Sequence, residues 1–267
     1  MIAFPQIDPV FLRIGPLAYR WYGMMYAISF ISAIFMIRAV AVRKKLAITH
    51  EQISDLMLYA AMGVILGGRL GYVLFYNPGY YFENPAKIIA VWEGGMAFHG
   101  GLIGAILGGI YFCKRSGFPV YAVADVSIVS VPLGLGLGRL GNFMNGELFG
   151  RASDVPWCMI FPGGGDVCRH PSQLYEAGLE GAALFVILWV LSKRTLAPGI
   201  VFWAMIAGYG FFRFLVEYTR EPDAHIGLLF GGFFSMGQLL SLPMVLLGGF
   251  MIWRQHALFS KTSLKLP

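Results

Sequence analysis

Seven long apolar stretches constrain this chain more than any other feature of its sequence. Each approaches the length of about 20 residues that a helix needs to cross the hydrocarbon core of a membrane. The apolar residues run continuously and do not alternate as in barrel strands. The sequence therefore predicts an all-α polytopic membrane protein with seven transmembrane helices. The stretches are roughly residues 21–42, 55–76, 94–113, 120–138, 175–192, 198–216 and 235–253.

The composition supports this fold class. Hydrophobic residues make up 57% of the chain and charged residues only 13%, against about 25% charged residues in soluble domains. Residues 1–15 have no basic region before an apolar run, so we expect the first span to act as its own signal for insertion. No basic cluster stands apart from the span ends, so we expect no nucleic-acid partner.

Basic residues predict the orientation, because cytoplasmic loops of membrane proteins are enriched in lysine and arginine. They follow the first, third, fifth and seventh predicted spans. The N-terminus is therefore predicted outside and the C-terminus in the cytoplasm. The residues concerned are Arg43, Lys44, Lys45, Lys114, Arg115, Lys193, Arg194, Arg254, Lys261 and Lys265.

The longer loops then lie on the outer side. We expect a single integral membrane domain over residues 1–267. Residues 139–174, rich in Gly, Pro and charge, are predicted to form a small head domain between spans four and five. It is too small to be stable alone. Residues 217–234 form a second outer loop.

In the segment 138–151 the apolar sequence ends, and polar and charged side chains that could bind a ligand begin. It contains two arginines, two asparagines, one glutamate and four glycines. Charged groups beside a bilayer are costly, and they usually mark a function or an ion network. Glycine permits a close approach of the backbone to a ligand. The alternative is a helix end with arginines that snorkel to the interface, followed by a glycine-rich turn.

Ionisable residues of several spans share one depth near the outer surface when they are counted along the predicted helices. A transporter would place its polar site near the midplane. Structural readings stay open, because Glu217 could simply neutralise Arg213 or Arg220, and tyrosines gather at membrane interfaces. The residues at this depth are Tyr22, Tyr26, Arg69, His99, Arg139, Asn142, Glu176, Glu180, Arg213, Glu217 and Arg220.

Arginine suits the recognition of phosphate, because its planar fork gives two parallel hydrogen bonds and keeps its charge. Arg139, Arg213 and Arg220 could converge on one lipid phosphate. His99, flanked by glycine, could accept a proton, since histidine titrates near neutral pH. A purely structural donor role for His99 is the alternative.

Cysteine and histidine spacing indicates no metal site, and no cofactor is expected. Cys158 and Cys168 both fall in the predicted outer head segment, where an oxidising compartment permits a disulfide. Two free thiols remain an equal alternative. A second glycine-rich segment, residues 67–72, is similar to residues 137–142. Helix packing through small residues explains this similarity more simply than a repeat.

Residues 138–151 resemble the signature of the bacterial prolipoprotein diacylglyceryl transferases. The resemblance extends over nearly the whole chain. It implies seven spans in the bacterial cytoplasmic (inner) membrane, with the active site facing the periplasm. The other segments that carry it are residues 21–23, 68–72, 99–101, 170–176, 209–217 and 235–238.

By this resemblance the chain is an enzyme with two partners, phosphatidylglycerol and the lipobox segment of a preprolipoprotein. It transfers the diacylglyceryl group to the lipobox cysteine thiol. A thioether forms and glycerol phosphate leaves, as the first step of lipoprotein maturation. Neither a metal nor another cofactor is implied.

The resemblance and the residue chemistry together give the candidate site. Arg139 and Arg213 are predicted to bind and polarise the phosphate, and His99 to orient or deprotonate the thiol. The other candidates bind substrate or hold the arginines: Tyr22, Asn142, Glu147, Gly150, Tyr209, Glu217 and Arg220. The competing hypotheses are a lipid or solute transporter or scramblase with an arginine headgroup gate, and a structural membrane scaffold.

Overall fold

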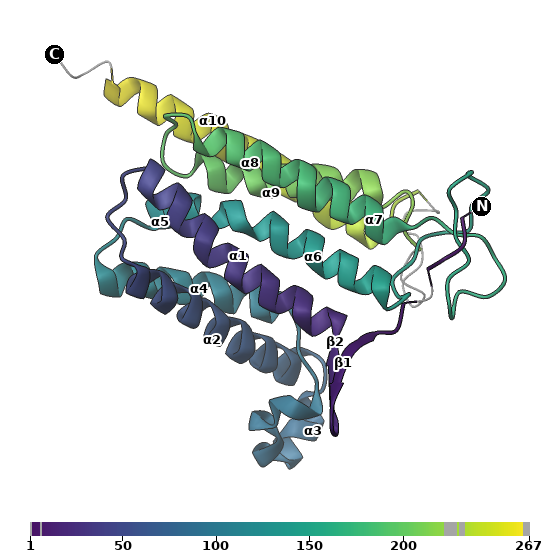
Figure 1. The fold of residues 1–267 in the computed structure, drawn as a ribbon. Helices are drawn as coiled ribbons and strands as arrows, with labels where there is room; N and C mark the ends of the chain where they lie inside the picture. Colours follow the sequence, from purple (N-terminus) through teal and green to yellow (C-terminus); the bar gives the residue numbers. More distant parts are fainter. Residues whose placement is uncertain (1, 6, 222–228, 230–232, 264–267) are drawn as a thin grey trace. The chain divides into compact units, whose positions relative to one another are not determined.

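The computed structural model describes residues 2–5, 7–221, 229 and 233–263. The chain divides into two compact units. The first comprises Met1–Val40 and Asp125–Pro267, and the second comprises Ala41–Ala124. Figure 1 traces their helices along the chain.

Helices cover most of all seven predicted stretches. In the first unit lie α1 (Trp21–Arg43, which runs on into the second unit), the end of α5 (Val120–Ser127), a 3-10 turn (Ile128–Ser130), α6 (Val131–Met144), α7 (Ser172–Glu176), a π-helical segment (Ala177–Ala183), α8 (Leu184–Ser192), α9 (Ile200–Val216) and α10 (Met236–Ser263). In the second lie α2 (His50–Phe75), α3 (Pro78–Glu83), 3-10 turns at Pro85–Ile89 and Val91–Glu93, and α4 (Phe98–Ser116).

Five helical segments within the described residues are long and apolar enough to cross a membrane. Large apolar side chains such as Phe35 and Leu74 are exposed on them, as expected of surfaces that face lipid. The chain is therefore a multi-pass membrane protein, while seven crossings remain a prediction. The five segments are Trp21–Arg43, His50–Phe75, Val120–Met144, Ser172–Ser192 and Met236–Ser260, and Ile200–Val216 is a shorter apolar helix.

A two-stranded hairpin precedes α1, and the sequence prediction did not include it. Strand β1 (Val10–Ile14) pairs antiparallel with β2 (Leu17–Arg20). Gly15, in the connecting turn, has a φ of +58°, which glycine adopts without steric cost. The hairpin is too short to give a clear alternating pattern.

Glycine contacts hold the helices of the first unit together. A Cβ on Gly181 of the π-helical segment would lie 2.7 Å from the Cα of Gly136 on α6. A Cβ on Gly210 of α9 would lie 2.9 Å from the Ser241 carbonyl oxygen on α10. The backbones therefore touch at these two points, which fixes the helices that carry the candidate site.

The second unit is built on the contact of α2 with α4. A Cβ on Gly67 would lie 2.3 Å from the Gly100 carbonyl oxygen, and one on Gly104 would lie 1.9 Å from that of Gly63. Any larger residue would force the helices apart. The interpretation of residues 67–72 as a helix-packing segment is thus confirmed.

Arg69 of α2 is buried and has a structural role in the second unit. Its guanidinium donates to the carbonyl oxygens of Ile88 at 2.8 Å and Lys87 at 2.5 Å, and also to that of Gly94. The ring of Tyr81 lies 5.1 Å from the guanidinium carbon. Arg69 therefore ties the segment between α2 and α4 to α2.

Candidate active site

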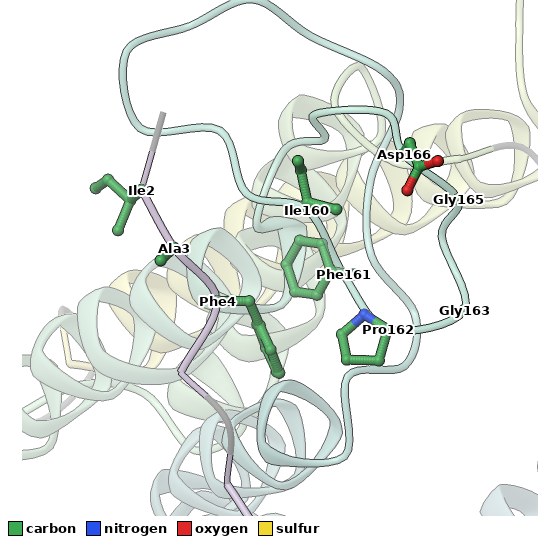
Figure 2. Close-up of a pocket in the computed structure, with 9 residues that line it drawn as sticks. All are labelled: Ile2, Ala3, Phe4, Ile160, Phe161, Pro162, Gly163, Gly165 and Asp166. Carbon is green, nitrogen blue, oxygen red and sulfur yellow. The ribbon is translucent and has the colours of Figure 1, made fainter.

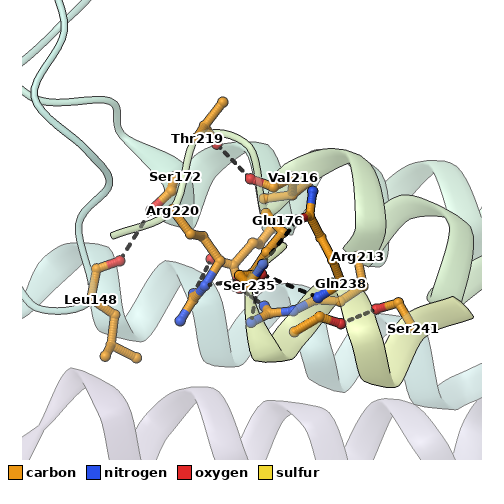
Figure 3. Close-up of polar contacts among 12 residues, drawn as sticks. Leu148, Ser172, Glu176, Arg213, Val216, Thr219, Arg220, Ser235, Gln238 and Ser241 are labelled. Atoms are coloured by element: carbon orange, nitrogen blue, oxygen red, sulfur yellow. Dashed lines mark hydrogen bonds and ion pairs between the residues drawn. The ribbon is translucent and has the colours of Figure 1, made fainter. Parts of the chain in front are cut away.

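The centre of the candidate site is the carboxylate of Glu176, which is 0% exposed at the end of α7. Its Oε2 lies 2.6 Å from Arg139 Nε on α6 and 3.1 Å from Arg213 Nη1 on α9. Its Oε1 lies 2.6 Å from Nη1 of Arg220, just beyond α9. Figure 3 shows Glu176 between Arg213 and Arg220. The three arginines that were predicted to converge on a lipid phosphate thus meet on one carboxylate, which the sequence did not predict.

Glu217 provides a second carboxylate to the same arginines. Its Oε2 lies 3.0 Å from Arg213 Nη2 and 3.6 Å from Arg220 Nε. A Cβ on Gly237 would lie 2.5 Å from the Glu217 carboxyl carbon, so the start of α10 covers this group closely. These contacts support the prediction that Glu217 holds the arginines.

The end of α6 forms a compact polar turn. Asn142 is buried, and its Nδ2 donates to Glu147 Oε1 at 3.0 Å. The Nδ2 of Asn145 donates to the same oxygen at 3.1 Å. Gln173 Nε2 donates to the Glu147 carbonyl oxygen at 2.7 Å. Two candidates, Asn142 and Glu147, therefore contact each other directly.

Gly150 is the point where the 139–174 segment meets the chain beyond α9. Its N–H donates to the His170 carbonyl oxygen at 2.9 Å, and it forms an isolated antiparallel bridge with Arg220. A Cβ here would lie 2.2 Å from the Thr219 carbonyl oxygen. The site therefore requires a glycine at this position for space.

Two further arginines stabilise the contact between residue 150 and the chain beyond α9. Arg151 Nε donates to the Arg220 carbonyl oxygen at 2.6 Å. Arg169 Nη1 donates to the Gly150 carbonyl oxygen at 3.2 Å and lies 2.7 Å from Glu221 Oε2. Both positions were missed as site-supporting residues, because only the folded chain brings residues 150 and 220 together.

A disulfide joins Cys158 and Cys168, whose Cα atoms are 5.4 Å apart. The backbone of Met159 exchanges hydrogen bonds with that of Arg169, at 2.9 and 2.8 Å. The disulfide hypothesis is thus confirmed over the two-thiol alternative.

His170, which follows Arg169, is partly buried. This burial lowers the pKa of its imidazole, while the charge of Asp154 opposes that shift.

Two tyrosines of the candidate list also lie in the first unit. The ring of Tyr22 on α1 packs against α6, where a Cβ on Gly141 would lie 2.9 Å from it. Its hydroxyl is 3.2 Å from that of Tyr26. Tyr209 on α9 interacts electrostatically with Glu180 and Arg213. Tyr22 therefore lies next to the helix of Arg139, and Tyr209 next to the arginine cluster.

His99 belongs to the second unit, where it is the second residue of α4. Its side chain is exposed, and its ring lies edge-on to that of Phe98. Its role stays a prediction.

A pocket of about 490 Å³ lies elsewhere in the first unit, between the N-terminal residues and residues 160–166 (Figure 2). Its lining includes Ile2, Phe4, Phe161 and Asp166. It contains none of the candidate residues.

The sequence list omitted the central group of the site. Glu176 was included among the residues expected near the outer surface but was not counted among the binding residues. Glu180 is likewise 0% exposed and lies 3.8 Å from Arg213 Nη1. Glu176 and Glu180 both lie at the outer end of the fifth predicted span, and two acidic residues at the edge of an apolar stretch were the available signal.

The fold and the site define a class, a multi-pass membrane protein with a cluster of paired arginine and glutamate side chains. The prolipoprotein diacylglyceryl transferase family matches residues 9–254. The chain belongs to this family.

Relatives of nearly equal length support the assignment. A protein named phosphatidylglycerol–prolipoprotein diacylglyceryl transferase from Geobacter sulfurreducens is 61% identical over 247 residues, which cover 92% of this chain and 94% of the relative. Proteins of the same name from Vibrio atlanticus (53% identical, 94% and 92% covered) and Bordetella avium (52%, 95% and 96%) are also similar. The chain is therefore a diacylglyceryl transferase of lipoprotein maturation, and a transporter or scramblase is not supported.

Proposed function

We propose that Arg139, Arg213 and Arg220 hold the phosphate of phosphatidylglycerol while its diacylglyceryl group passes to the thiol of a lipobox cysteine. The observation that carries this proposal is their convergence on Glu176. The carboxylate is 0% exposed, whereas the three arginine side chains keep 14–21% of their surface exposed. Each guanidinium can therefore contact Glu176 on one side and a phosphate on another.

The reaction is a substitution at carbon. The thiolate sulfur attacks the terminal glyceryl carbon of the diacylglyceryl group and forms a C–S bond. The C–O bond to phosphate breaks, and its electron pair stays on the departing glycerol phosphate. Arginines aimed at that oxygen stabilise the charge that develops there. Stabilisation of the leaving group thus depends on positioned charge, which the arginine cluster would supply.

The thiol must lose its proton before it attacks, since the thiolate is the nucleophile. We assign this step to His99, which would orient or deprotonate the thiol. Asn142, Glu147, Tyr22 and Tyr209 would shape the pocket around the headgroup.

We also infer the topology. The chain would cross the bacterial inner membrane seven times, with its cluster facing the periplasm and residues 139–174 as a periplasmic head domain. A second outer loop, residues 217–234, falls largely outside the described residues. The asymmetry of lysine and arginine supports this orientation. A cytoplasm-active reporter fused after Pro267 should be active and a periplasm-active one silent. The reverse result would overturn the orientation.

The activity is tested with purified protein, phosphatidylglycerol and a lipobox peptide. The expected products are a thioether-linked peptide and free glycerol phosphate, both measured by mass spectrometry. A peptide with serine in place of the lipobox cysteine should give neither. Glycerol phosphate release without a thioether would contradict the transfer and indicate a lipid hydrolase.

A further inference from the structure

We propose that Glu180 takes up a proton when an anionic lipid phosphate binds the arginine cluster, so that binding is coupled to protonation of the enzyme. The inference rests on the proposed function, because it concerns the same phosphate site. It assigns a role to a buried carboxyl group that the transfer step itself does not use.

The surroundings of Glu180 set it apart from the other carboxylates. Its side chain is 0% exposed. Neither carboxyl oxygen has a hydrogen-bond partner among the described residues. The nearest cationic atom is Arg213 Nη1 at 3.8 Å, and Glu176 holds that same nitrogen at 3.1 Å. An ionised carboxylate is costly to bury without such partners.

The backbone places Glu180 in this position. It lies in the π-helical segment Ala177–Ala183 that continues α7. Such segments insert a residue into a helix and often occur at functional sites. The charged and titratable groups that interact electrostatically with Glu180 are Arg213 and Tyr209 from α9, Glu176 from α7, Arg139 from α6, and Arg220 beyond α9.

The charge balance of the cluster explains why a proton should enter. Three arginines, Arg139, Arg213 and Arg220, face three carboxylates, Glu176, Glu180 and Glu217. If all are ionised, the cluster is neutral, and a phosphodiester then adds one negative charge. Uncompensated charge is expensive in a poorly hydrated site. One proton restores neutrality.

Glu180 is the group best suited to accept this proton. Glu176 has arginine nitrogens at 2.6, 2.6 and 3.1 Å, and Glu217 has one at 3.0 Å. Protonation of either would forfeit close ion pairs. Glu180 has only the 3.8 Å contact to lose. A phosphate that draws Arg213 toward itself weakens even that contact.

The coupling has a measurable consequence. A phosphodiester stays ionised throughout the neutral range, so a proton taken up on binding must enter the protein. By linkage, the affinity for phosphatidylglycerol then falls as pH rises, by up to about tenfold per pH unit wherever Glu180 is ionised in the free enzyme and protonated in the complex.

The first test compares full-length wild-type enzyme with Glu180→Gln and Asp166→Asn in detergent micelles. The Kd for short-chain phosphatidylglycerol is measured from pH 6 to pH 9. Wild type should bind more weakly as pH rises, and Glu180→Gln should remove that slope and bind more tightly than wild type at pH 9. Asp166→Asn removes an exposed carboxylate of the head segment and should keep the wild-type slope. An unchanged slope in Glu180→Gln, or loss of binding by this variant while it remains folded, would overturn the proposal.

A second measurement needs no variant, so it decides the matter even if Glu180→Gln does not fold. Calorimetric titration of wild type in two buffers with different ionisation enthalpies counts the protons exchanged on binding. Uptake of about one proton is expected at a pH within the sloping range, and no uptake anywhere would refute the coupling. Thioether formation is assayed on the same preparation. A missing product would refute the proposed transfer, whereas the proton count judges the coupling independently.

Discussion

Arg139 Nε lies 2.6 Å from Glu176 Oε2, and this ion pair joins α6 to α7, which are separated in the sequence by most of the head segment. Glu176 is fully buried, whereas the Arg139 side chain is 21% exposed. The carboxylate is therefore the fixed partner, and it orients Arg139, Arg213 and Arg220 before any lipid arrives. Preorganised charge of this kind avoids reorganisation during the reaction.

Substitution of Glu176 by Gln should destabilise the enzyme. The amide keeps the shape but leaves three arginines with one counter-charge fewer. Removal of one partner from a buried ion pair typically costs about 3–5 kcal/mol. We expect a lower midpoint of thermal unfolding in detergent and a lower rate of thioether formation.

The matched control for this variant is Glu221→Gln. Glu221 also pairs with an arginine, at 2.7 Å from Arg169 Nη1, but its side chain is 51% exposed. Exposed pairs contribute only about 0–1 kcal/mol. If both variants unfold at the same temperature, Glu176 does not organise the cluster.

Gly150→Ala should impair transfer through steric conflict. The new methyl group would lie 2.2 Å from the Thr219 carbonyl oxygen and 2.9 Å from the His170 Cβ. The head segment must then move away from the chain that carries Arg220. We expect at least about tenfold slower turnover, because small misplacements of catalytic groups are costly. Gly138→Ala is the control, since a Cβ there has nothing within 4 Å, and wild-type turnover in both variants would refute the requirement.

Much of the fold was predictable, because helices that lie in a membrane require long apolar stretches that are easily recognised in the sequence. Apolar stretches of helical length identified the helices, and small residues in residues 67–72 indicated close helix packing, whose partner the structure shows to be α4. The N-terminal hairpin escaped prediction, because strands of four and five residues leave too little pattern. The role of Arg69 also escaped, because it depends on carbonyl groups of a distant irregular segment.

For the candidate site, the sequence identified the three arginines but not Glu176, the carboxylate on which they converge. Arg139, Arg213 and Arg220 were identified from residue chemistry and shared depth. They meet on Glu176, and Glu180 lies beside them with no hydrogen-bond partner among the described residues. Both facts follow from the packing of α6, the π-helical segment and α9. Sequence spacing gives depth along a helix but not the face that meets a neighbour.

Loss of the disulfide should loosen the head segment. In the chain-entropy model, closing so short a loop stabilises a protein by roughly 2–3 kcal/mol. Cys158→Ser together with Cys168→Ser should therefore speed limited proteolysis within residues 139–174. Cys113→Ser is the control, because Cys113 is a free cysteine. Non-reducing peptide mapping should recover residues 158 and 168 of wild type as one linked pair, and alkylation of both thiols without reductant would contradict the bond.

Arg139→Lys should abolish most transfer while the protein still inserts and purifies normally. The positive charge remains, so the attraction of an anionic lipid should survive. The planar fork is lost, and one ammonium group must serve both Glu176 and the phosphate. A charge-assisted hydrogen bond contributes about 1.5–3 kcal/mol. If it tightens as the phosphate leaves, its loss slows turnover by roughly ten- to a hundredfold.

The measurement is the turnover number of Arg139→Lys at saturating phosphatidylglycerol and lipobox peptide, beside Arg139→Ala and Arg13→Lys. Arg13 lies exposed in β1, so its replacement by lysine should leave turnover unchanged. An arginine that merely snorkels at a helix end would tolerate lysine, because a long cationic side chain is all that such a position requires. Near-normal turnover of Arg139→Lys, with Arg139→Ala impaired, would therefore contradict a two-donor contact of Arg139 with the phosphate. It would instead support a membrane-anchoring role for Arg139.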